Sequence, residues 1–532
     1  DYFLGGRDAT WLAIGASIFA SNIGSEHLIG LAGAGASSGM AMAHWEIQGW
    51  MILILGWVFV PFYTRSMVYT MPEFLERRYN PQSRTILSVI SLVSYVLTKV
   101  AVTVYAGGLV FQQVFGIKEL WGIDFFWIAA IGLVVLTALY TIFGGMKSVL
   151  YTSVLQTPIL LLGSLIILVL GFKELGGWDE MMRVCGAVTV NDYGDTMTNL
   201  IRSNDDANFP WLGALIGSAI IGFWYWCTDQ FIVQRVLSGK NEMEARRGTI
   251  FGAYLKLLPV FLFLIPGMIA FALHQKYIGA GGEGFLPMLE NGTANADAAF
   301  PTLVAKLLPA GVKGLVVCGI LAALMSSLAS LFNSSAMLFT IDFYKRFRPQ
   351  TSEKKLVGIG QVATVVIVIL GILWIPIMRS VGDVLYTYLQ DVQSVLAPGI
   401  AAAFLLGICW KRTSAQGGMW GLISGMVIGL TRLGAKVYYS NAGEVADSTF
   451  KYLFYDMNWL FFCGWMFLFC IIVVIVVSLA TEAPTAEKIQ GLVFGTATKE
   501  QKASTRASWN HWDIIHTVII LAITGAFYWY FW

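Results

Sequence analysis

The sequence predicts an all-α protein that crosses a membrane many times. Of its 532 residues, 57% are hydrophobic and only 12% are charged, whereas a soluble domain carries about 25% charged residues. Apolar runs of about 20 residues, the length that spans a bilayer as a helix, recur along the whole chain. This composition argues against a soluble enzyme, a disordered chain and a nucleic-acid-binding protein. The net charge of +2 also gives no basis for a polyanionic partner.

Thirteen transmembrane helices are predicted from these apolar runs. They cover residues 10–33, 40–64, 85–115, 123–143, 148–172, 209–235, 249–275, 312–343, 356–378, 384–408, 416–434, 454–480 and 511–532. With the N-terminus in the cytoplasm, 21 of the 34 Lys and Arg residues fall in inner segments, as the positive-inside rule requires. The C-terminus is then outside, and so are the long loops 173–208 and 276–311.

Two of the predicted spans are interrupted in the middle by small and polar residues. The first is interrupted between Ala20 and His27, and the sixth between Gly222 and Gln230. Paired broken helices in two units of opposite orientation indicate the substrate site of a secondary transporter, although glycine in membrane helices also permits close packing. The predicted division is 1–172 for the first five-helix unit, 173–208 for an outer loop, 209–408 for the second five-helix unit and 409–532 for three peripheral helices.

Ionisable residues within membrane spans are costly and are taken as functional by default, and three of those in the predicted spans stand out. They are Glu46, Lys99 and Lys256. Lys256 lies about eight residues inside its span, or about 12 Å of helix rise, which is deep for an ammonium group that reaches back to the surface. For Lys99, reaching the surface and pairing with a neighbouring helix are equally good interpretations.

Three uncharged or weakly basic residues with hydrogen-bonding side chains accompany them at or near the expected helix breaks. They are Asn22, His27 and Gln390. Each of them alone could serve a contact between helices. Together with Glu46 and Lys256 they supply the mixed donors and acceptors that sugar hydroxyl groups need, and Tyr225 and Trp226 offer an aromatic face to the apolar side of a sugar ring.

Span eight carries closely spaced serines, among them Ser326, Ser327 and Ser330. Serines in membrane helices often bond only to the carbonyl group four residues earlier. The functional interpretation is a site for a hard cation, because Na⁺ needs hydroxyl and freed carbonyl oxygens, and an unwound neighbouring helix supplies the carbonyls.

Four stretches carry a resemblance to a known family. They are Ala16–His27; Trp224–Gln230 with Gln234 and Arg235 after it; Ala253–Pro259; and Met325–Leu328 running on to Phe339–Asp342. With these residues the chain resembles the sodium/glucose cotransporter family, the solute:sodium symporters of the LeuT fold, over nearly its whole length. The fold class that the resemblance implies is an inverted repeat of five plus five helices with peripheral C-terminal helices.

The resemblance also implies roles for individual residues. A sodium site would consist of the carbonyl oxygens of Ala20, Ile23 and Ala323 with the hydroxyl groups of Ser326 and Ser327. A sugar site would consist of Asn22, His27, Glu46, Lys256 and Gln390. Tyr225 would close the sugar site from the cytoplasmic side with Trp226 beside it, and an outer hydrophobic lid would consist of Leu31, Trp45 and Tyr386.

The chain departs from the family pattern at three positions. Ser153 stands where some relatives that bind a second sodium carry Asp, so we expect one sodium per sugar. Gly222 stands where relatives carry Thr or Asn near the sugar, so one contact is expected to be missing and the sugar preference to shift. Trp45 replaces a smaller aromatic residue of the lid.

The predicted function is uptake of a neutral sugar, of glucose or galactose type, driven by inward flow of Na⁺ through alternating access. A symporter of the same fold for inositol or another small polar solute is the alternative. A membrane enzyme is disfavoured because no nucleophile–base pair or metal-spaced cluster lies in the spans, and a channel suits paired broken helices less well. Na⁺ is the expected cofactor, and the sugar and membrane lipid are the expected partners, with no nucleic acid and no obligatory protein partner. The cysteine-rich outer loops of the family's animal members are absent, so a bacterial inner membrane is the expected location. The family's usual helix before the first core helix is also absent, which is consistent with a trimmed or short N-terminus.

Overall fold

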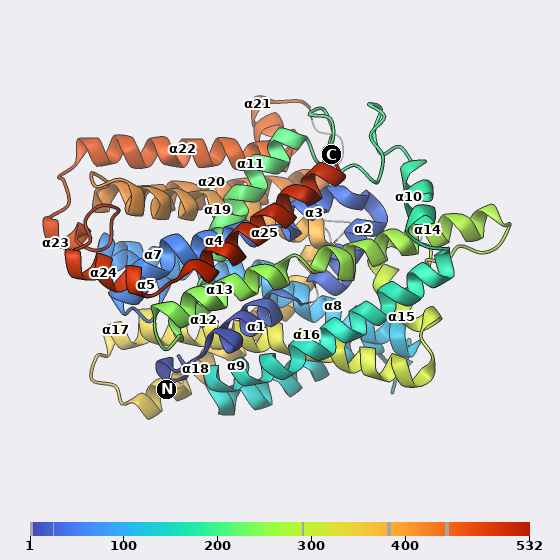
Figure 1. Cartoon of the computed structure of the whole chain (residues 1–532), viewed down its shortest axis with the longest axis horizontal. Helices are drawn as coiled ribbons and strands as arrows, with labels where there is room; N and C mark the ends of the chain where they lie inside the picture. The colour runs from blue at the N-terminus through green and yellow to red at the C-terminus, as the bar shows by residue number, and fades with distance from the viewer. Residues whose placement is uncertain (1–3, 25, 290–291, 380–384, 442–445) are drawn as a thin grey trace.

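The structure of the chain is a computed structural model that describes residues 4–24, 26–289, 292–379, 385–441 and 446–532. It is a long helical bundle (Figure 1). The helices of the first part are α1 (Trp11–Asn22), α2 (Ala32–Ser38), α3 (Ala43–Glu46), α4 (Gly49–Ile54), α5 (Val60–Ser66), α6 (Met71–Arg78), α7 (Pro81–Ser94), α8 (Ala101–Phe115), α9 (Phe125–Leu175) and α10 (Trp178–Gly186). The only strands in the described part of the chain are the antiparallel pair β1 (Glu119–Leu120) and β2 (Ile123–Asp124).

The remaining helices follow the outer loop after α10. They are α11 (Trp211–Gly222), α12 (Gln230–Leu237), α13 (Glu242–Lys256), α14 (Ile265–Gly279), α15 (Ala299–Leu307), α16 (Ala310–Met337), α17 (Lys345–Phe347), α18 (Glu353–Arg379), α19 (Leu385–Cys409), α20 (Ala415–Asn441), α21 (Thr449–Lys451), α22 (Trp459–Ala480), α23 (Ala486–Ile489), α24 (Lys499–Ala507) and α25 (His511–Tyr530). Short π-helical segments continue several of them: η2 (Glu26–Leu31), η4 (Leu55–Phe59), η5 (Tyr95–Val100), η6 (Phe223–Thr228), η7 (Val260–Leu264), η9 (Leu338–Tyr344) and η10 (Tyr452–Asp456). The 3-10 turns are η1 (Gly5–Arg7), η3 (Gly39–Met42) and η8 (Ala296–Ala298).

Each of the thirteen predicted spans contains a helix, but the count of thirteen membrane crossings is not confirmed. Within the described residues, ten helical stretches are long and apolar enough to cross a bilayer, and two shorter apolar stretches lie at Trp11–Asn22 and Phe125–Leu139. The predicted spans 123–143 and 148–172 both fall within α9. The predicted span 416–434 forms α20, which is not among the ten.

Both predicted helix breaks are present. Helix α1 ends at Asn22, where Ile23 has an extended backbone with φ −80° and ψ 101°, and helical structure resumes at Glu26. The segment η6 ends at Thr228, and Asp229 has φ −75° and ψ 128°. The side chain of Asp229 then accepts a hydrogen bond from the backbone N–H of Phe231 and so caps α12. The breaks therefore leave helix ends, with their unsatisfied backbone groups, inside the bundle.

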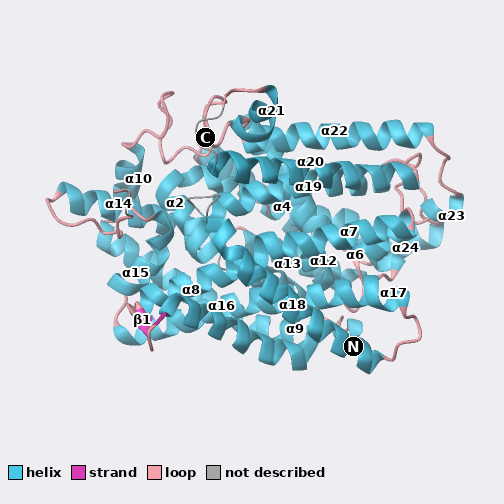
Figure 2. Cartoon of the chain, turned by 180° about the vertical axis from the view of Figure 1, so that it is seen from behind, coloured by secondary structure: helices cyan, strands magenta, loops and turns pink. Residues whose placement is uncertain are grey.

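The two ends of the bundle carry different segments (Figures 1 and 2). The N-terminus, α17, α23 and α24 lie at one end in both views, whereas α10 and the outer tip of α14 lie at the other. This arrangement agrees with the predicted alternation of inner and outer loops. The division into two five-helix units with the boundaries given above stays a prediction.

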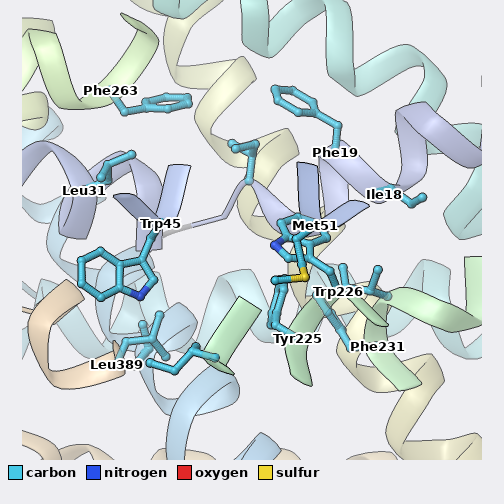
Figure 3. Close-up of a cluster of buried hydrophobic side chains, with 14 of the residues drawn as sticks. Ile18, Phe19, Leu31, Trp45, Met51, Tyr225, Trp226, Phe231, Phe263 and Leu389 are labelled. Carbon is cyan, nitrogen blue, oxygen red and sulfur yellow. The ribbon is translucent and has the colours of Figure 1, made fainter. Parts of the chain in front are cut away.

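Buried apolar side chains surround both breaks (Figure 3). Labelled there are Ile18, Phe19, Leu31, Trp45, Met51, Tyr225, Trp226, Phe231, Phe263 and Leu389. They come from α1, η2, α3, α4, η6, α12, η7 and α19, and each is at most 8% exposed. The polar groups at the helix breaks thus lie in a region from which water is largely excluded.

Candidate functional site

A network of buried polar side chains joins the two halves of the bundle at the helix breaks. Lys256 Nζ donates to Glu46 Oε2 at 2.7 Å and to Asn22 Oδ1 at 3.1 Å. Asn22 Nδ2 donates to the hydroxyl group of Tyr225 at 3.1 Å. His27 Nε2 lies 3.2 Å from the same oxygen of Glu46 that receives Lys256. Five elements, α1, η2, α3, η6 and α13, thus contribute to one hydrogen-bonded cluster.

Local irregularities in the helices aim these side chains inward. Asn22 is the last residue of α1, and His27 lies in the first turn after the break. Glu46 ends the short helix α3. Lys256 ends α13, two residues before the bend that precedes Pro259, because proline cannot continue the hydrogen-bond ladder of a helix. The predicted alternative that Lys256 reaches the surface is wrong, since the residue is 3% exposed and is paired with Glu46.

The network borders a small internal cavity of about 40 Å³. Its lining comprises Asn22, Glu26, His27, Trp45, Gln48, Ile221, Gly222, Tyr225, Trp226, Lys256, Leu389, Gln390 and Gln393. Two buried polar atoms of this lining, Gln390 Oε1 and Trp45 Nε1, have no hydrogen-bond partner among the described residues. One is an acceptor and the other a donor. Buried polar atoms usually have a hydrogen-bond partner, so these two atoms could accept from and donate to a ligand that carries both kinds of group.

One side of the cavity is closed by aromatic side chains and a second buried ion pair. Lys99 pairs with Asp229, and Tyr95 donates to the same carboxylate at 2.6 Å. Lys99 Nζ also lies 4.8 Å from the centre of the Tyr225 ring, which itself lines the cavity. Of the two interpretations of Lys99, pairing with a neighbouring helix is therefore the correct one.

The opposite side carries two of the three predicted lid residues. Leu31 is fully buried, and Trp45 is 3% exposed and stacks on Trp459 with ring centres 5.5 Å apart. Trp45 lines the cavity, as does Leu389, which the sequence did not indicate. Tyr386, the third predicted lid residue, has a side chain that lies outside the described part of the structure.

The oxygens predicted for sodium lie where the end of α1 meets α16. Ser327 Oγ is 3.5 Å from the carbonyl oxygen of Ser21 and 2.8 Å from the point where Gly24 would carry a Cβ. Ser326 and Ser327 are both 1% exposed, and Ala323 lies one turn earlier on the same helix. No backbone N–H among the described residues beyond α1 donates to the carbonyl oxygen of Ala20. Buried hydroxyl groups beside carbonyls freed by a helix end form an oxygen-rich set suited to a hard monovalent cation.

Comparisons with known proteins agree with this geometry. Residues 2–425 match the Sodium:solute symporter family. The chain belongs to this family. Sodium/myo-inositol cotransporter 2 from Homo sapiens is 37% identical over 508 residues, which cover 93% of this chain and 74% of that protein. The sodium/myo-inositol cotransporter from Canis lupus familiaris is 37% identical over 516 residues, which cover 93% of this chain and 71% of that protein.

Two solved structures share the fold. A Na⁺-coupled sialic acid symporter in a substrate-bound, outward-open state superposes with a TM-score of 0.70 at 22% identity, covering 91% of this chain and 93% of that one. Mhp1, a nucleobase-cation-symport-1 family transporter in a closed conformation with bromovinylhydantoin bound, gives a TM-score of 0.50 at 14% identity, covering 95% of this chain and 98% of that one. The predicted all-α membrane fold of LeuT type is confirmed. The protein is a sodium-coupled symporter with Na⁺ as its coupling ion, and it is not an enzyme.

Gln48 is a residue of this symporter's cavity that sequence reasoning missed. Its Nε2 donates to the carbonyl oxygen of Ser218 at 2.8 Å, and its Oε1 accepts from Trp226 Nε1 at 3.3 Å. A Cβ at Gly222 would lie only 2.5 Å from Gln48 Oε1. The space that glycine leaves at position 222 is therefore filled by the Gln48 amide from the turn between α3 and α4, and is not simply a lost contact.

Glu26 and Gln393 also line the cavity without having been predicted. Glu26 lies beside His27 within the predicted interruption of the first span. Its position in this interruption was the sequence signal that could have placed it at the cavity. Gln393 lies one turn after Gln390 on α19, and this three-residue spacing places both on one face of the helix.

Exchange of Gly222 for threonine is expected to displace Gln48, because the new Cβ would meet the amide at 2.5 Å. We expect the preference between two competing neutral substrates to change by up to about tenfold, because one hydrogen bond contributes about 0.5–1.5 kcal/mol and about 1.4 kcal/mol corresponds to a factor of ten. Competition of unlabelled polyols and sugars against labelled substrate measures it. Gln48→Ala in the Gly222→Thr background is the control, and a preference unchanged in both variants would contradict the assignment of Gln48 to the substrate cavity.

Proposed function

We propose that this symporter couples inward movement of Na⁺ to uptake of a neutral cyclic polyol of the inositol type, with one sodium per substrate molecule. The observation that carries the proposal is the buried network of Lys256, Glu46 and Asn22 beside a cavity between the two helix breaks. The relatives named above are myo-inositol cotransporters. Their names support the alternative drawn from the sequence better than a glucose- or galactose-like substrate.

The chemistry of the cavity supports a neutral polyhydroxylated ring. Glu46 and Lys256 carry opposite charges and neutralise each other, so no cation is left over for a carboxylate substrate. Asn22 can both donate and accept, and Gln390 Oε1 and Trp45 Nε1 add an unpaired acceptor and donor. Each hydroxyl group of a polyol can both donate and accept, so a ring with a hydroxyl group at every carbon matches such alternating partners. Tyr225 and Trp226 meet edge to face with ring centres 4.9 Å apart and would cover the C–H face.

The size of the cavity supports alternating access. At about 40 Å³ it holds a few water molecules but is far smaller than the pockets of about 300–1,000 Å³ that enclose small organic ligands. Substrate entry would therefore require movement of the surrounding walls. We propose that Trp45 and Leu31 move for access from outside and that Tyr225, held by the Lys99–Asp229 pair, moves for access from the cytoplasm.

We propose that Na⁺ is held by the carbonyl oxygens of Ala20, Ile23 and Ala323 and the hydroxyl groups of Ser326 and Ser327. The proposed ligands include the end of α1, where Asn22 begins the substrate network. An ion there would hold the end of α1 against α16 and fix the side chain of Asn22 for substrate. Ion and substrate would then both bind more tightly to the same conformation of the break than to other conformations. Coupling requires such a difference in affinity between conformations.

One sodium per substrate is supported by the surroundings of Ser153. Its hydroxyl group donates to the carbonyl oxygen of Val149 at 2.6 Å, and it carries no charge to attract a second cation. A membrane potential of 100 mV contributes about 2.3 kcal/mol per charge, and a tenfold sodium gradient adds about 1.4 kcal/mol. Together these sustain a substrate gradient of roughly 500-fold, so one ion is sufficient for accumulation.

The proposal is tested by uptake of labelled myo-inositol, glucose and galactose into proteoliposomes with an inward gradient of Na⁺ or of K⁺. We expect Na⁺-dependent accumulation that is fastest for myo-inositol. Uptake that is indifferent to Na⁺ would refute coupling, and uptake of glucose alone would refute the polyol preference. Reversal potentials give the stoichiometry, and a value of two sodium ions would contradict the argument from Ser153.

Replacing Ser327 with alanine is expected to raise the sodium concentration for half-maximal uptake at least about tenfold, since a hydrogen-bonding ligand to a charge contributes about 1.5–3 kcal/mol. Uptake measured over a range of Na⁺ concentrations tests this. Ser330→Ala is the matched control, because Ser330 lies one turn away on α16 and bonds the side chain of Ser21 at 2.8 Å but is outside the proposed ligand set. Equal shifts in the two variants would argue against the site.

The protein is a multi-pass membrane protein. We propose that it lies in a plasma membrane, of bacterial type, with the N-terminal end of this chain in the cytoplasm and the C-terminal end outside. The concentration of 21 of 34 Lys and Arg residues in the inner segments supports this orientation.

A further inference from the structure

An apolar groove on the outside of the bundle lies between α7 with η5, the segment η9 and α18. Its volume is about 740 Å³. Residues of its wall include Leu92, Val96, Phe339, Val362, Val366 and Leu370. Val362, Val366 and Leu370 are 63%, 50% and 47% exposed. The groove is thus open to the hydrocarbon of the bilayer and separate from the central cavity.

One end of the groove is strongly basic. Between residues 343 and 358 the chain carries Lys345, Arg346, Arg348, Lys354 and Lys355 against a single acidic residue, Glu353. All six of these side chains are exposed. Lys355 lies four residues before Ile359, which lines the groove, so both lie on the same face of α18. Lys345 directly follows Tyr344, another residue of the wall.

The groove is long enough to hold a lipid chain of one leaflet. The α18 wall runs from Ile359 to Trp374, a distance of 15 residue-to-residue steps and therefore about 22 Å at 1.5 Å per step. One leaflet contributes about half of the roughly 30 Å hydrocarbon core. The groove is long enough to hold one acyl chain along its whole depth, starting about one helical turn from the ammonium group of Lys355.

We propose that this groove binds an anionic phospholipid, with one acyl chain against α18 and the phosphate between Lys345 and Lys355. A net charge of four positive units at the mouth favours an anionic over a zwitterionic headgroup, because each basic residue near a membrane surface contributes about 1 kcal/mol toward anionic lipid. Phe347, which is 76% exposed between these basic residues, adds an apolar ring at the mouth of the groove.

The proposed lipid would contact segments that lead to the transport site. Leu97, in the groove wall, accepts a hydrogen bond at its carbonyl oxygen from Tyr388 of α19 at 3.3 Å. Tyr388 also accepts from Trp374, which lines the groove, at 3.0 Å. Lys99 of the closing ion pair follows Leu97 on the same segment, η5. A bound lipid would therefore support the packing of η5 against α18 and α19.

The test is native mass spectrometry of the purified full chain, titrated with phosphatidylglycerol or phosphatidylcholine after removal of copurified lipid. We expect one phosphatidylglycerol to bind at least about tenfold more tightly than phosphatidylcholine. The double variant Lys345→Gln with Lys355→Gln, at the headgroup end, should remove the preference for phosphatidylglycerol. Val366→Trp, within the groove, should remove the binding. Soluble glycerol phosphate should not compete, because it lacks the acyl chain.

A matched control is Lys499→Gln with Lys502→Gln, which removes two exposed charges from α24 and should leave lipid binding unchanged. Equal binding of the two lipids, competition by glycerol phosphate, or wild-type binding by either test variant would overturn the proposal. Because Lys345 and Lys355 are exposed, the double Gln variant should fold normally even where Val366→Trp does not. Thermal unfolding of each variant verifies this.

Discussion

Replacing Lys256 with methionine is expected to abolish Na⁺-driven uptake and to destabilise the protein. Lys256 is the donor that joins Glu46 to Asn22, and Glu46 is fully buried. Removing one partner of a buried ion pair leaves a charge in a region of low dielectric constant, at a cost of about 3–5 kcal/mol. Uptake in proteoliposomes and thermal unfolding in detergent measure the two effects, and we expect the unfolding temperature to fall by several degrees.

The double variant Lys256→Met with Glu46→Gln separates stability from function. Removing both charges leaves no buried carboxylate that has lost its lysine partner, so we expect most of the lost stability to return while uptake stays absent. Lys502→Met is the control for loss of a lysine, because Lys502 is exposed on α24. Wild-type uptake by the double variant would show that the ion pair serves only packing.

Replacing Asp229 with asparagine is expected to lower coupled uptake at least about tenfold, as the loss of a buried charge-assisted hydrogen bond implies. Asparagine keeps the shape, can still cap α12, and can still accept from Tyr95. The change therefore removes chiefly the charge opposite Lys99, which lies against the ring of Tyr225. A looser Tyr225 is expected to let Na⁺ cross without substrate, seen as a substrate-independent sodium leak.

A double-mutant cycle with Lys99→Met decides whether the pair acts as one unit. Residues that contact each other directly show coupling energies of about 0.5–3 kcal/mol, so the double variant should be less impaired than the sum of the single variants. Strictly additive losses in uptake and in unfolding temperature would contradict a joint role in closing the cavity.

Much of the fold could be predicted because its signals are local. Apolar length indicates membrane spans, and the breaks at Ile23 and Asp229 lie within the polar interruptions from which they were predicted. The number of crossings was less predictable. The sequence predicts two separate spans, 123–143 and 148–172, with Lys147 in the inner segment between them, whereas the backbone is helical through all of α9. Local polarity alone does not decide whether a helix ends.

The candidate site was only partly predictable, because its remaining members depend on contacts between distant segments. Asn22, His27, Glu46, Lys256, Tyr225, Trp226 and Gln390 all line or border the cavity. Gln48 was missed because the backbone between α3 and α4 is not helical. Ile47 and Gln48 have ψ values of 26° and 23°, so helical spacing from Glu46 does not predict where the Gln48 side chain points. The pairing of Lys99 with Asp229 spans 130 residues and has no signature in either segment.

Asn22 has an unusual position with a further consequence. It is the terminal residue of α1, so its amide belongs to the proposed substrate network while the nearby carbonyl groups of Ala20 and Ile23 belong to the proposed ion ligands. Because the end of α1 would serve both ion and substrate, the proposed coupling works equally in both directions. The gradients of sodium and solute across the membrane would then decide the direction of transport. On the proposed coupling, a cell whose sodium gradient collapses would lose its accumulated solute outward through the same protein.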